Sequence, residues 1–204
     1  LVRDLGCAGC HRIASVTQGA AEVPKLQGVG DKLRPDWVAG YLRTPIPVRP
    51  WLRSRMPAFQ LSESEGQVLA EYLQSLRDHR LLPLPKRLML SGNPSPVLAE
   101  AGRRLASLDY LACVSCHVTG GQTPEGPREG WAPDLVLAGR RLQPDWIVRW
   151  LQDPQRFQPG TRMPSFFTED RSGPEDILGG NEEEQILALR DYLVSLGMTG
   201  GGQP

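Results

Sequence analysis

The sequence has little of several features that mark common protein classes. Its 23 basic and 23 acidic residues balance to a formal net charge of zero, which gives no support for a nucleic-acid partner. No stretch approaches the roughly 20 consecutive apolar residues that a transmembrane helix needs. Four cysteines in 204 residues are too few for a disulfide scaffold, and the alternating pattern typical of strands is missing. The missing strand alternation favours an all-α fold.

The four cysteines form two C-x-x-C pairs, and a histidine follows each pair directly. C-x-x-C-H is the attachment signature of haem c. The two thiols, about one helical turn apart, add across the two vinyl groups of one haem, and the adjacent imidazole binds the iron. The sequence therefore predicts two covalently bound haem c groups. The attachment residues are Cys7, Cys10, Cys113 and Cys116, and the proximal ligands are His11 and His117.

Other interpretations of the cysteines explain less. A thioredoxin-like redox pair would be a single C-x-x-C within a βαβ pattern, whereas this chain has two pairs and no such pattern. A four-cysteine zinc site would need ligands from motifs 106 residues apart, and it would leave both histidines unexplained. Simple disulfides would leave the histidines unexplained as well. Haem attachment is the interpretation that accounts for all six residues.

An internal repeat relates the two halves of the chain. Each half contains Pro-x-Leu, then Pro-Asp-Trp nine residues past the leucine, then Arg-Met-Pro-x-Phe, and finally Tyr-Leu-x-Ser-Leu. Repeats of this kind mark one structural unit that is used more than once. The matched residues include Pro24 and Pro133, Gly30 and Gly139, Trp37 and Trp146, Tyr41 and Trp150, Pro45 and Pro154, Arg55 and Arg162, and Tyr72 and Tyr192.

The repeat also selects a sixth ligand for each iron. A methionine thioether is a soft ligand that suits haem iron, and the chain has four methionines. Only Met56 and Met163 share the Arg-Met-Pro context, and they follow His11 and His117 by 45 and 46 residues. We therefore predict axial ligation by these two methionines. The remaining histidine, His79, is predicted to be a solvated residue at a helix end, with a bis-histidine site as the alternative.

Five helices are expected from the sequence. The two Pro-Asp-Trp triplets place proline and an acid in a first turn, which predicts short helices over residues 37–43 and 146–152. Each is expected to stop before a proline. Residues 96–109 are predicted to form a helix that leads into the second attachment motif. Longer amphipathic helices are predicted over residues 62–78 and 181–196.

The two longer helices carry recognisable start signals and apolar stripes. Ser62 is the expected N-cap of the first, with Glu65 completing a capping box, and Asn181 is the expected cap of the second. The predicted apolar stripe of the first helix is Val68, Leu69, Tyr72, Leu73 and Leu76, and that of the second is Ile186, Leu189, Leu193 and Leu196. Each half is therefore expected to be a small all-α domain around a haem.

In this order of elements the chain resembles class I cytochromes c, and two such units in tandem resemble the di-haem members of that family. The resemblance implies six-coordinate irons with His/Met ligation, and it implies that the helices over 62–78 and 181–196 pack across an N-terminal helix near each haem. It also suggests contacts to the haem propionates. The candidates for those contacts are Trp37, Arg55, Trp146 and Arg162.

Two departures from that pattern stand out. The helix before the first motif is cut short, because Leu1 aligns with Ser107 across the 106-residue offset. We therefore expect an upstream extension in the natural product: a signal peptide, a membrane anchor or another domain. The second half also has an insertion within residues 168–180, interpreted as a tolerated surface loop or as an element that contacts a partner.

The expected organisation is a first cytochrome c domain over residues 1–88, a linker over 89–95, a second domain over 96–198 and a Gly-rich tail over 199–204. The expected function is electron transfer without substrate turnover, between a quinol-oxidising complex or dehydrogenase and an acceptor such as a terminal oxidase. The chain would act as a carrier or as a subunit of a respiratory-chain complex. Its expected location is the bacterial periplasm or the periplasmic face of the inner membrane. The alternative is a di-haem enzyme such as a cytochrome c peroxidase.

Overall fold

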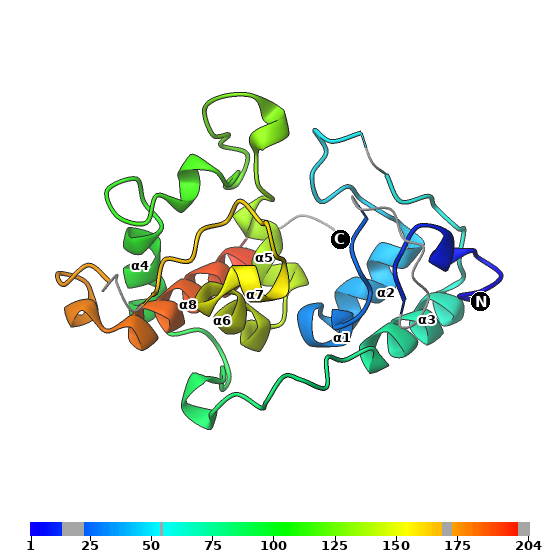
Figure 1. The fold of residues 1–204 in the computed structure, drawn as a ribbon, viewed down its shortest axis with the longest axis horizontal. Helices are drawn as coiled ribbons and strands as arrows, with labels where there is room; N and C mark the ends of the chain where they lie inside the picture. The colour runs from blue at the N-terminus through cyan, green and yellow to red at the C-terminus, as the bar shows by residue number, and fades with distance from the viewer. Residues whose placement is uncertain (14–22, 54, 169–172, 200–204) are drawn as a thin grey trace. The chain divides into compact units, whose positions relative to one another are not determined.

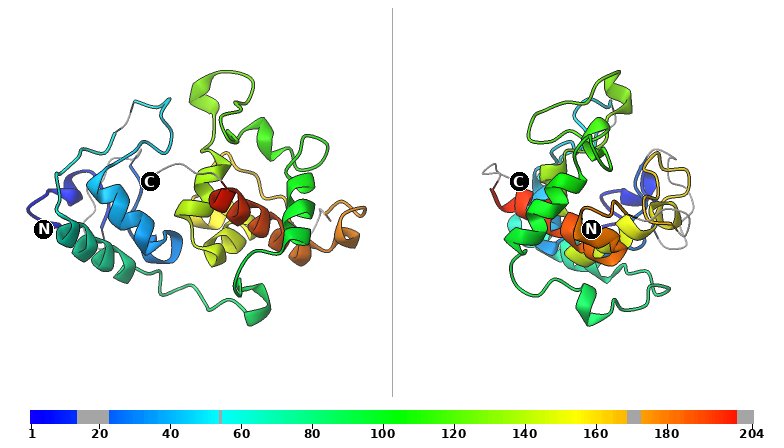
Figure 2. Two further views of the ribbon diagram at one scale, coloured as in Figure 1. Left: turned by 180° about the vertical axis from the view of Figure 1, so that it is seen from behind. Right: turned by 90° about the vertical axis from the view of Figure 1, so that its left-hand side faces the viewer.

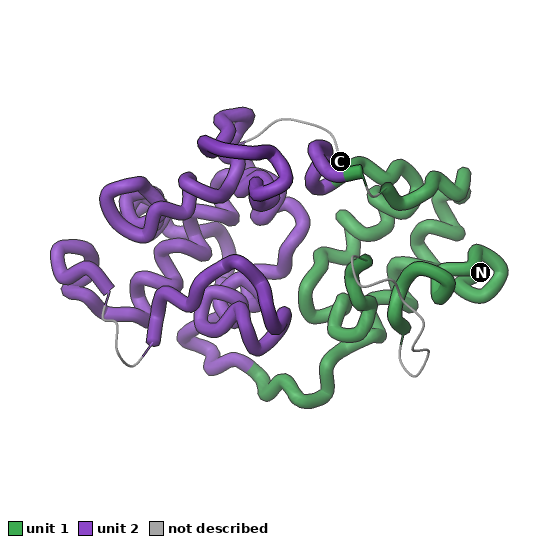
Figure 3. The backbone as a smooth tube through the Cα atoms, turned by 45° about the horizontal axis from the view of Figure 1, so that its top comes forward, with its two compact units in different colours: residues 1–47, 53–83, 203–204 green, residues 48–52, 84–202 purple. Residues whose placement is uncertain are grey.

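The structure is a computed structural model that describes residues 1–13, 23–53, 55–168 and 173–199. Those residues form helices and turns, and they contain no strand, in agreement with the all-α prediction. The chain divides into two compact units (Figure 3). The first contains Leu1–Pro47 and Arg53–Pro83, and the second contains Val48–Leu52 and Leu84–Gly202. No helix in the described part of the chain has the length and apolarity that crossing a membrane requires.

The described residues of the first unit form three α-helices: α1 (Val29–Lys32), α2 (Pro35–Arg43) and α3 (Glu63–Ser75). Helix α2 has Pro35 in its first turn and ends at Arg43, before the next proline, as predicted. The capping box at the start of α3 is confirmed: the Ser62 side chain accepts from the Glu65 amide, and the Glu65 carboxylate accepts from the Ser62 amide. The local sequence thus fixes where both helices begin.

The core of the first unit lies between α2 and α3. Buried Val38 and Leu42 of α2 face buried Leu69, Ala70 and Leu73 of α3. Helix α3 ends at Ser75, three residues before the predicted end, and an acidic side chain from α1 binds the backbone that follows. The Asp78 amide donates to the Asp31 carboxylate at 2.7 Å.

Part of the predicted apolar stripe of α3 is wrong. Val68 and Tyr72 are 54% and 40% exposed, although Leu69 and Leu73 on the same helix are buried. Helix α3 packs one side onto α1 and α2, and the residues before Cys7 form turns rather than a helix. Within the described chain, the first unit therefore lacks the N-terminal helix that the resemblance implied, as the short leading segment led us to expect.

Five α-helices lie in the part of the second unit that the structure describes, and Figure 1 labels them. They are α4 (Pro96–Leu105), α5 (Leu135–Arg141), α6 (Pro144–Gln152), α7 (Pro154–Phe157) and α8 (Glu182–Thr199). Helix α6 ends at Gln152 as predicted and begins two residues earlier, at Pro144. Helix α8 runs three residues past its predicted end. Helix α4 stops four residues earlier than predicted, because the chain turns back on itself: the amide of Leu111 donates to the carbonyl of Leu105. This reversal carries the chain into the second attachment motif.

Close helix crossings organise the second unit, and glycine makes them possible. Helix α4 crosses α8 (Figure 2), and Gly102 lies so close to α8 that a methyl group there would overlap the Ala188 carbonyl. Gly139 of α5 lies equally close to the backbone of α8 at Leu193. The matched glycine of the first unit, Gly30, lies against the backbone of α3 at Gln74. The repeat in sequence is therefore also a repeat in packing.

The described part of the insertion, residues 173–180, is anchored to the core of the second unit. Ile177 is 2% exposed and belongs to the main apolar cluster. Buried Gln185 of α8 donates from Nε2 to the carbonyls of Pro174 and Ile177. At the surface, the Asp176 carboxylate accepts from the Tyr110 hydroxyl and from Arg104. The insertion thus packs against α8 and against the turn that precedes Cys113.

Candidate haem-attachment sites

Both attachment motifs fold into the same tight turn. Each begins with a short 3₁₀ turn, Cys7–Gly9 or Cys113–Ser115. In each, the amide of the following histidine donates to the carbonyl of the first cysteine at 2.9 Å. The residue before each turn is left-handed, with φ of 66° at Gly6 and 49° at Ala112. One turn of backbone therefore carries two thiols and an imidazole, as the attachment chemistry requires.

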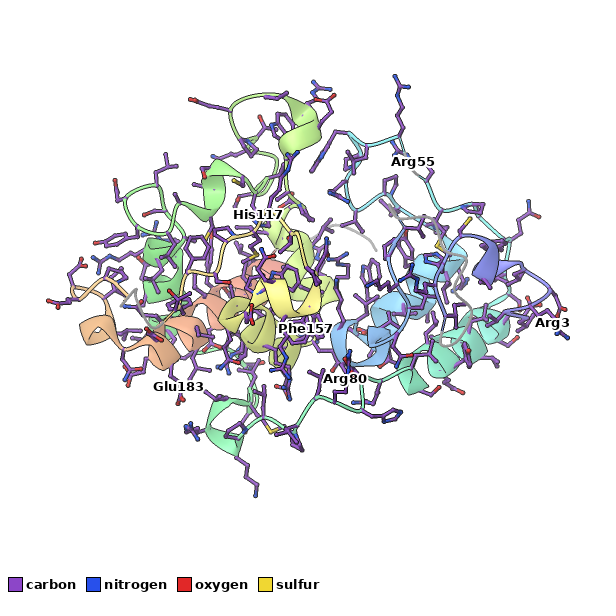
Figure 4. All side chains as sticks on the ribbon, in the orientation of Figure 1. Arg3, Arg55, Arg80, His117, Phe157 and Glu183 are labelled. Carbon is purple, nitrogen blue, oxygen red and sulfur yellow. The ribbon has the colours of Figure 1, made fainter. Side chains whose placement is uncertain are left out.

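The histidine of each motif makes the same hydrogen bond to a proline carbonyl. His11 Nδ1 lies 2.8 Å from the Pro24 oxygen, and His117 Nδ1 lies 2.7 Å from the Pro133 oxygen. A carbonyl only accepts, so Nδ1 must carry the proton, and the lone pair of a neutral ring then lies on Nε2. This arrangement orients the ring and leaves one nitrogen to bind a metal. Figure 4 labels His117 on the second unit.

The pKa shifts of the site residues fit haem attachment and iron binding better than they fit catalysis by a thiol. Burial raises the pKa of the Cys113 thiol to about 11, and burial also raises the pKa of the Cys7 thiol. A catalytic cysteine needs the opposite shift, because the thiolate is the nucleophile. Burial lowers the pKa of His117, while its bond to the Pro133 carbonyl opposes that effect. His117 is therefore held in the neutral form that binds metals.

Met163 and Cys113 reach the same apolar interior from distant parts of the sequence. Both side chains are half-buried and pack against the main core cluster of the second unit. The indole Nε1 of Trp150 on α6 donates to the Met163 sulfur at 2.8 Å. A thioether sulfur has two lone pairs, so this bond leaves one for a metal. The predicted attachment residue and the predicted axial ligand thus both border the same apolar core.

Met56 occupies the corresponding place in the first unit. It is half-buried and packs against the apolar cluster between α2 and α3, together with Leu5 and Leu26. It lies on an irregular segment between the two helices. The other two methionines, Met89 and Met198, are 46% and 63% exposed. The two methionines that the repeat selected are therefore the ones that reach a core.

The residues suggested for propionate contacts have unequal surroundings. Trp146 is 7% exposed and meets Phe157 edge-on at 4.5 Å (Figure 4 labels Phe157). Trp37 stacks on Tyr41 at 4.6 Å. Arg55 and Arg162 are exposed at the surface. Both tryptophans thus pack within their own units, and a role for any of the four toward propionates stays a prediction.

Sequence reasoning missed three contributors to the sites. Pro24 and Pro133 were recognised as repeated residues, but their carbonyls were not recognised as partners of the histidines. Trp150 was matched to Tyr41 without a role, although an indole N–H thirteen positions before Met163 can reach a sulfur. Part of the signal was present: a proline recurs after each attachment histidine, 13 residues after His11 and 16 residues after His117.

The residues present fit a covalently bound haem. Each site offers two thiols on one turn and an imidazole whose Nε2 lone pair is left for iron, and a soft thioether lies against the same apolar core in the second unit. Elsewhere, the described residues contain no group of three or more His, Cys, Asp or Glu side chains that could hold a metal ion. The donor set therefore fits haem c better than it fits a zinc site.

Comparison with known families supports this assignment for the first unit. Residues 1–77 match the family model described as Cytochrome c. This stretch includes the first attachment motif, Met56 and α3. The match supports a cytochrome c family, whose domains carry covalently bound haem c and indicate a role in electron transfer. No curated protein and no solved structure matches the chain.

Proposed function

We propose that this chain is a di-haem c-type cytochrome that transfers electrons between redox partners. One haem is attached at Cys7 and Cys10, with axial ligands His11 and Met56. The other is attached at Cys113 and Cys116, with axial ligands His117 and Met163. The observation that carries the second haem is the imidazole bond from His117 to Pro133, because it repeats the bond from His11 to Pro24 in the unit that matches the family.

The haem, when bound, supplies an iron that changes between its ferrous and ferric forms. The residues of the chain set the conditions for that change. The proline carbonyls fix the imidazoles, and the thioethers close the sixth position, so that substrates have no vacant place to bind. The apolar cores of the two units exclude water, and methionine ligation in such a pocket raises the reduction potential. An iron with no vacant position, which rearranges little between its ferrous and ferric forms, fits an electron carrier better than an enzyme.

The proposal includes partners and a location. The expected donor is a quinol-oxidising complex or dehydrogenase, and the expected acceptor is a terminal oxidase or another redox protein. The periplasm, or the periplasmic face of a bacterial inner membrane, is the proposed location, because cytochrome c domains are commonly extracytoplasmic. Trp37, Trp146, Arg55 and Arg162 remain candidates for propionate contacts. No catalytic residue is proposed.

The experiment that tests this function measures electron exchange and peroxide turnover on the same holoprotein. Rapid mixing of the reduced protein with an oxidised small cytochrome should oxidise both haems. Hydrogen peroxide with a reduced electron donor should give no catalytic turnover above that of free haem c peptide. Sustained peroxide turnover would instead favour the di-haem peroxidase, which needs an iron that methionine does not close.

A matched pair of variants tests the second haem specifically. Cys113→Ala with Cys116→Ala should remove one haem mass from the intact protein and leave the other attached. Cys7→Ala with Cys10→Ala should also remove one haem mass, this time that of the first unit, and leave the haem of the second unit attached. If the parent protein carries one haem and the Cys113 and Cys116 variant loses none, the second unit has no attachment site.

A further inference from the structure

The residue that follows the histidine-binding proline differs in charge between the two units. It is Asp134, after Pro133, in the second unit and Lys25, after Pro24, in the first. Both prolines accept a hydrogen bond from the imidazole of their own unit. An acid at this position is therefore not required for that bond, because the first unit makes it with a lysine in the same place.

The Asp134 side chain joins two segments of the second unit. It is half-buried, and its Oδ1 accepts from the Gly120 amide at 3.1 Å and from the Val136 amide at 3.0 Å. Beside it, the Leu135 amide donates to the Val118 carbonyl at 2.9 Å. These bonds hold the carboxylate next to the chain that follows the second attachment motif.

Part of the role of Asp134 is to begin helix α5. It is the N-cap of that helix, which starts at Leu135. Lysine has no acceptor with which to cap a helix, and after Lys25 the helix α1 starts only at Val29, behind Gly28. Capping accounts for the hydrogen bonds of Asp134, but it does not need a negative charge, because asparagine caps a helix about as well as aspartate does.

The negative charge of Asp134 acts on the proximal imidazole. Burial lowers the pKa of His117, and both the Pro133 carbonyl and the Asp134 carboxylate oppose that shift. The carboxylate thus stabilises positive charge at the ring. Among the residues that the structure describes, no lysine or arginine forms an ion pair with Asp134, so no direct partner there cancels its charge.

We propose that Asp134, a positioning residue of the proximal imidazole, lowers the reduction potential of the second haem through its negative charge. The inference rests on the proposed function, in which His117 binds the iron. On reduction the iron takes up one electron and its positive charge falls by one, with no change in its ligands. A fixed anion next to a ligand therefore favours the ferric form over the ferrous form.

The test is a spectroelectrochemical titration of the holoprotein with both haems attached. Two one-electron steps are expected, and the step whose midpoint falls in Met163→Ala belongs to the second haem, because methionine ligation raises the potential. Asp134→Asn keeps the cap and removes the charge. At a fixed potential it should raise the ferrous-to-ferric ratio of the second haem by about three- to tenfold, where tenfold equals about 59 mV for one electron. The midpoint of the first haem should stay in place.

Two further variants control for charge in general and for loss of the cap. Glu183→Gln removes one negative charge at the start of α8, well away from His117 (Figure 4), and should move neither midpoint because solvent and salt screen so distant a charge. Asp134→Ala removes the cap and the charge together. It should raise the second midpoint as Asp134→Asn does, and unlike Asp134→Asn it should unfold at a lower denaturant concentration.

The outcomes separate this inference from the proposed function. A parent protein with a single one-electron step contradicts the second haem, and the inference falls with it. If two steps are present and Asp134→Asn leaves the second midpoint unmoved, the di-haem assignment stands and the role of the charge is refuted. A rise in Asp134→Ala without one in Asp134→Asn would also overturn the inference, because loss of the cap alone would then account for it.

Discussion

Gly102 of α4 lies directly against the backbone of Ala188 in α8, with no room for a side chain between them. Replacing Gly102 with alanine should therefore force the two helices apart. Overpacking at such a crossing typically costs about 1–3 kcal/mol. We therefore expect Gly102→Ala to lower the free energy of unfolding of the second unit by about 1–3 kcal/mol or more. Denaturant unfolding of the holoprotein, followed by far-ultraviolet circular dichroism, measures the change.

Gly130→Ala is the control for this variant. A methyl group at Gly130 would meet only the end of the Arg162 side chain, at an ordinary 3.7 Å, and its backbone needs no positive φ. The control should unfold like the parent protein, within about 0.5 kcal/mol. Equal stability of the Gly102 variant and the parent would show that this crossing is looser than described.

The residue before each attachment turn has a left-handed backbone, which predicts that glycine there stabilises the unit and that alanine there destabilises it. Ala112 has φ of 49° and Gly6 has φ of 66°, and this conformation costs an L-residue about 1 kcal/mol more than glycine. We expect Ala112→Gly to stabilise the second unit by about 1 kcal/mol, and Gly6→Ala to destabilise the first by a similar amount. Chemical denaturation of the two holoprotein variants checks both signs, and a destabilised Ala112→Gly variant would contradict the assigned backbone.

A buried ion pair in α8 predicts a large loss of stability. Arg190 and Asp191 are 4% and 1% exposed. Asp191 accepts from Arg190 at 2.8 Å and from the Ser95 amide at 2.9 Å, and Arg190 donates to the Leu88 carbonyl. Asp191→Ala leaves a buried cation without its carboxylate, which costs roughly 3–5 kcal/mol. The unfolding free energy of the second unit should fall by that amount.

The repeat supplies the matched control for Asp191. The corresponding residue in the first unit is Glu71, which is exposed and accepts from Gln67 Nε2 at 3.3 Å. Glu71→Ala should change the unfolding free energy by no more than about 0.5 kcal/mol. Similar losses for the two variants would mean that the Asp191 pair contributes nothing specific to the second unit.

The capping box of α3 gives a variant with a predicted pH dependence. Ser62→Ala removes the cap that accepts from the Glu65 amide, at a cost of about 1 kcal/mol. The hydrogen bonds from the Ser62 backbone and hydroxyl lower the pKa of Glu65. Their contribution is therefore present above the unfolded-state pKa of about 4.3, and it is lost as the pH falls through the lower folded-state pKa.

Thermal melts at two pH values test that dependence. The difference between the parent protein and Ser62→Ala should be largest near neutral pH and should shrink below about pH 4. Ser64→Ala, in the first turn but not at the cap, serves as the control and should change stability less. A difference that grows on acidification would contradict the assigned bonds.

Much of the helical framework was predictable because it depends on local signals. The Ser62 cap and the prolines at Pro35 and Pro144 begin helices at or next to the predicted residues. Helix α7 was missed because Pro154 was interpreted only as the end of the preceding helix, whereas it also begins the next one. A proline can do both, since its fixed φ suits a first helical turn.

The features that could not be predicted depend on neighbours far along the chain. The exposure of Val68 and Tyr72 depends on whether another helix covers α3, which a helical stripe alone does not say. The anchoring of the insertion depends on Ile177 and Gln185 meeting in the core. At the sites, the motifs predicted which residue types bind the iron. They did not predict that proline carbonyls accept from the histidines, because every residue has a carbonyl and only the fold determines which one lies next to the imidazole.

The central claim is that each of the two units holds a haem closed by histidine and methionine. Its most direct test is the intact mass of the native protein together with the near-infrared band of its ferric form. The account predicts two covalent haems per chain and a methionine-to-iron band with the intensity of two haems, half of which is lost in Met163→Ala. One haem per chain, or two haems with no such band in the second unit, would contradict it.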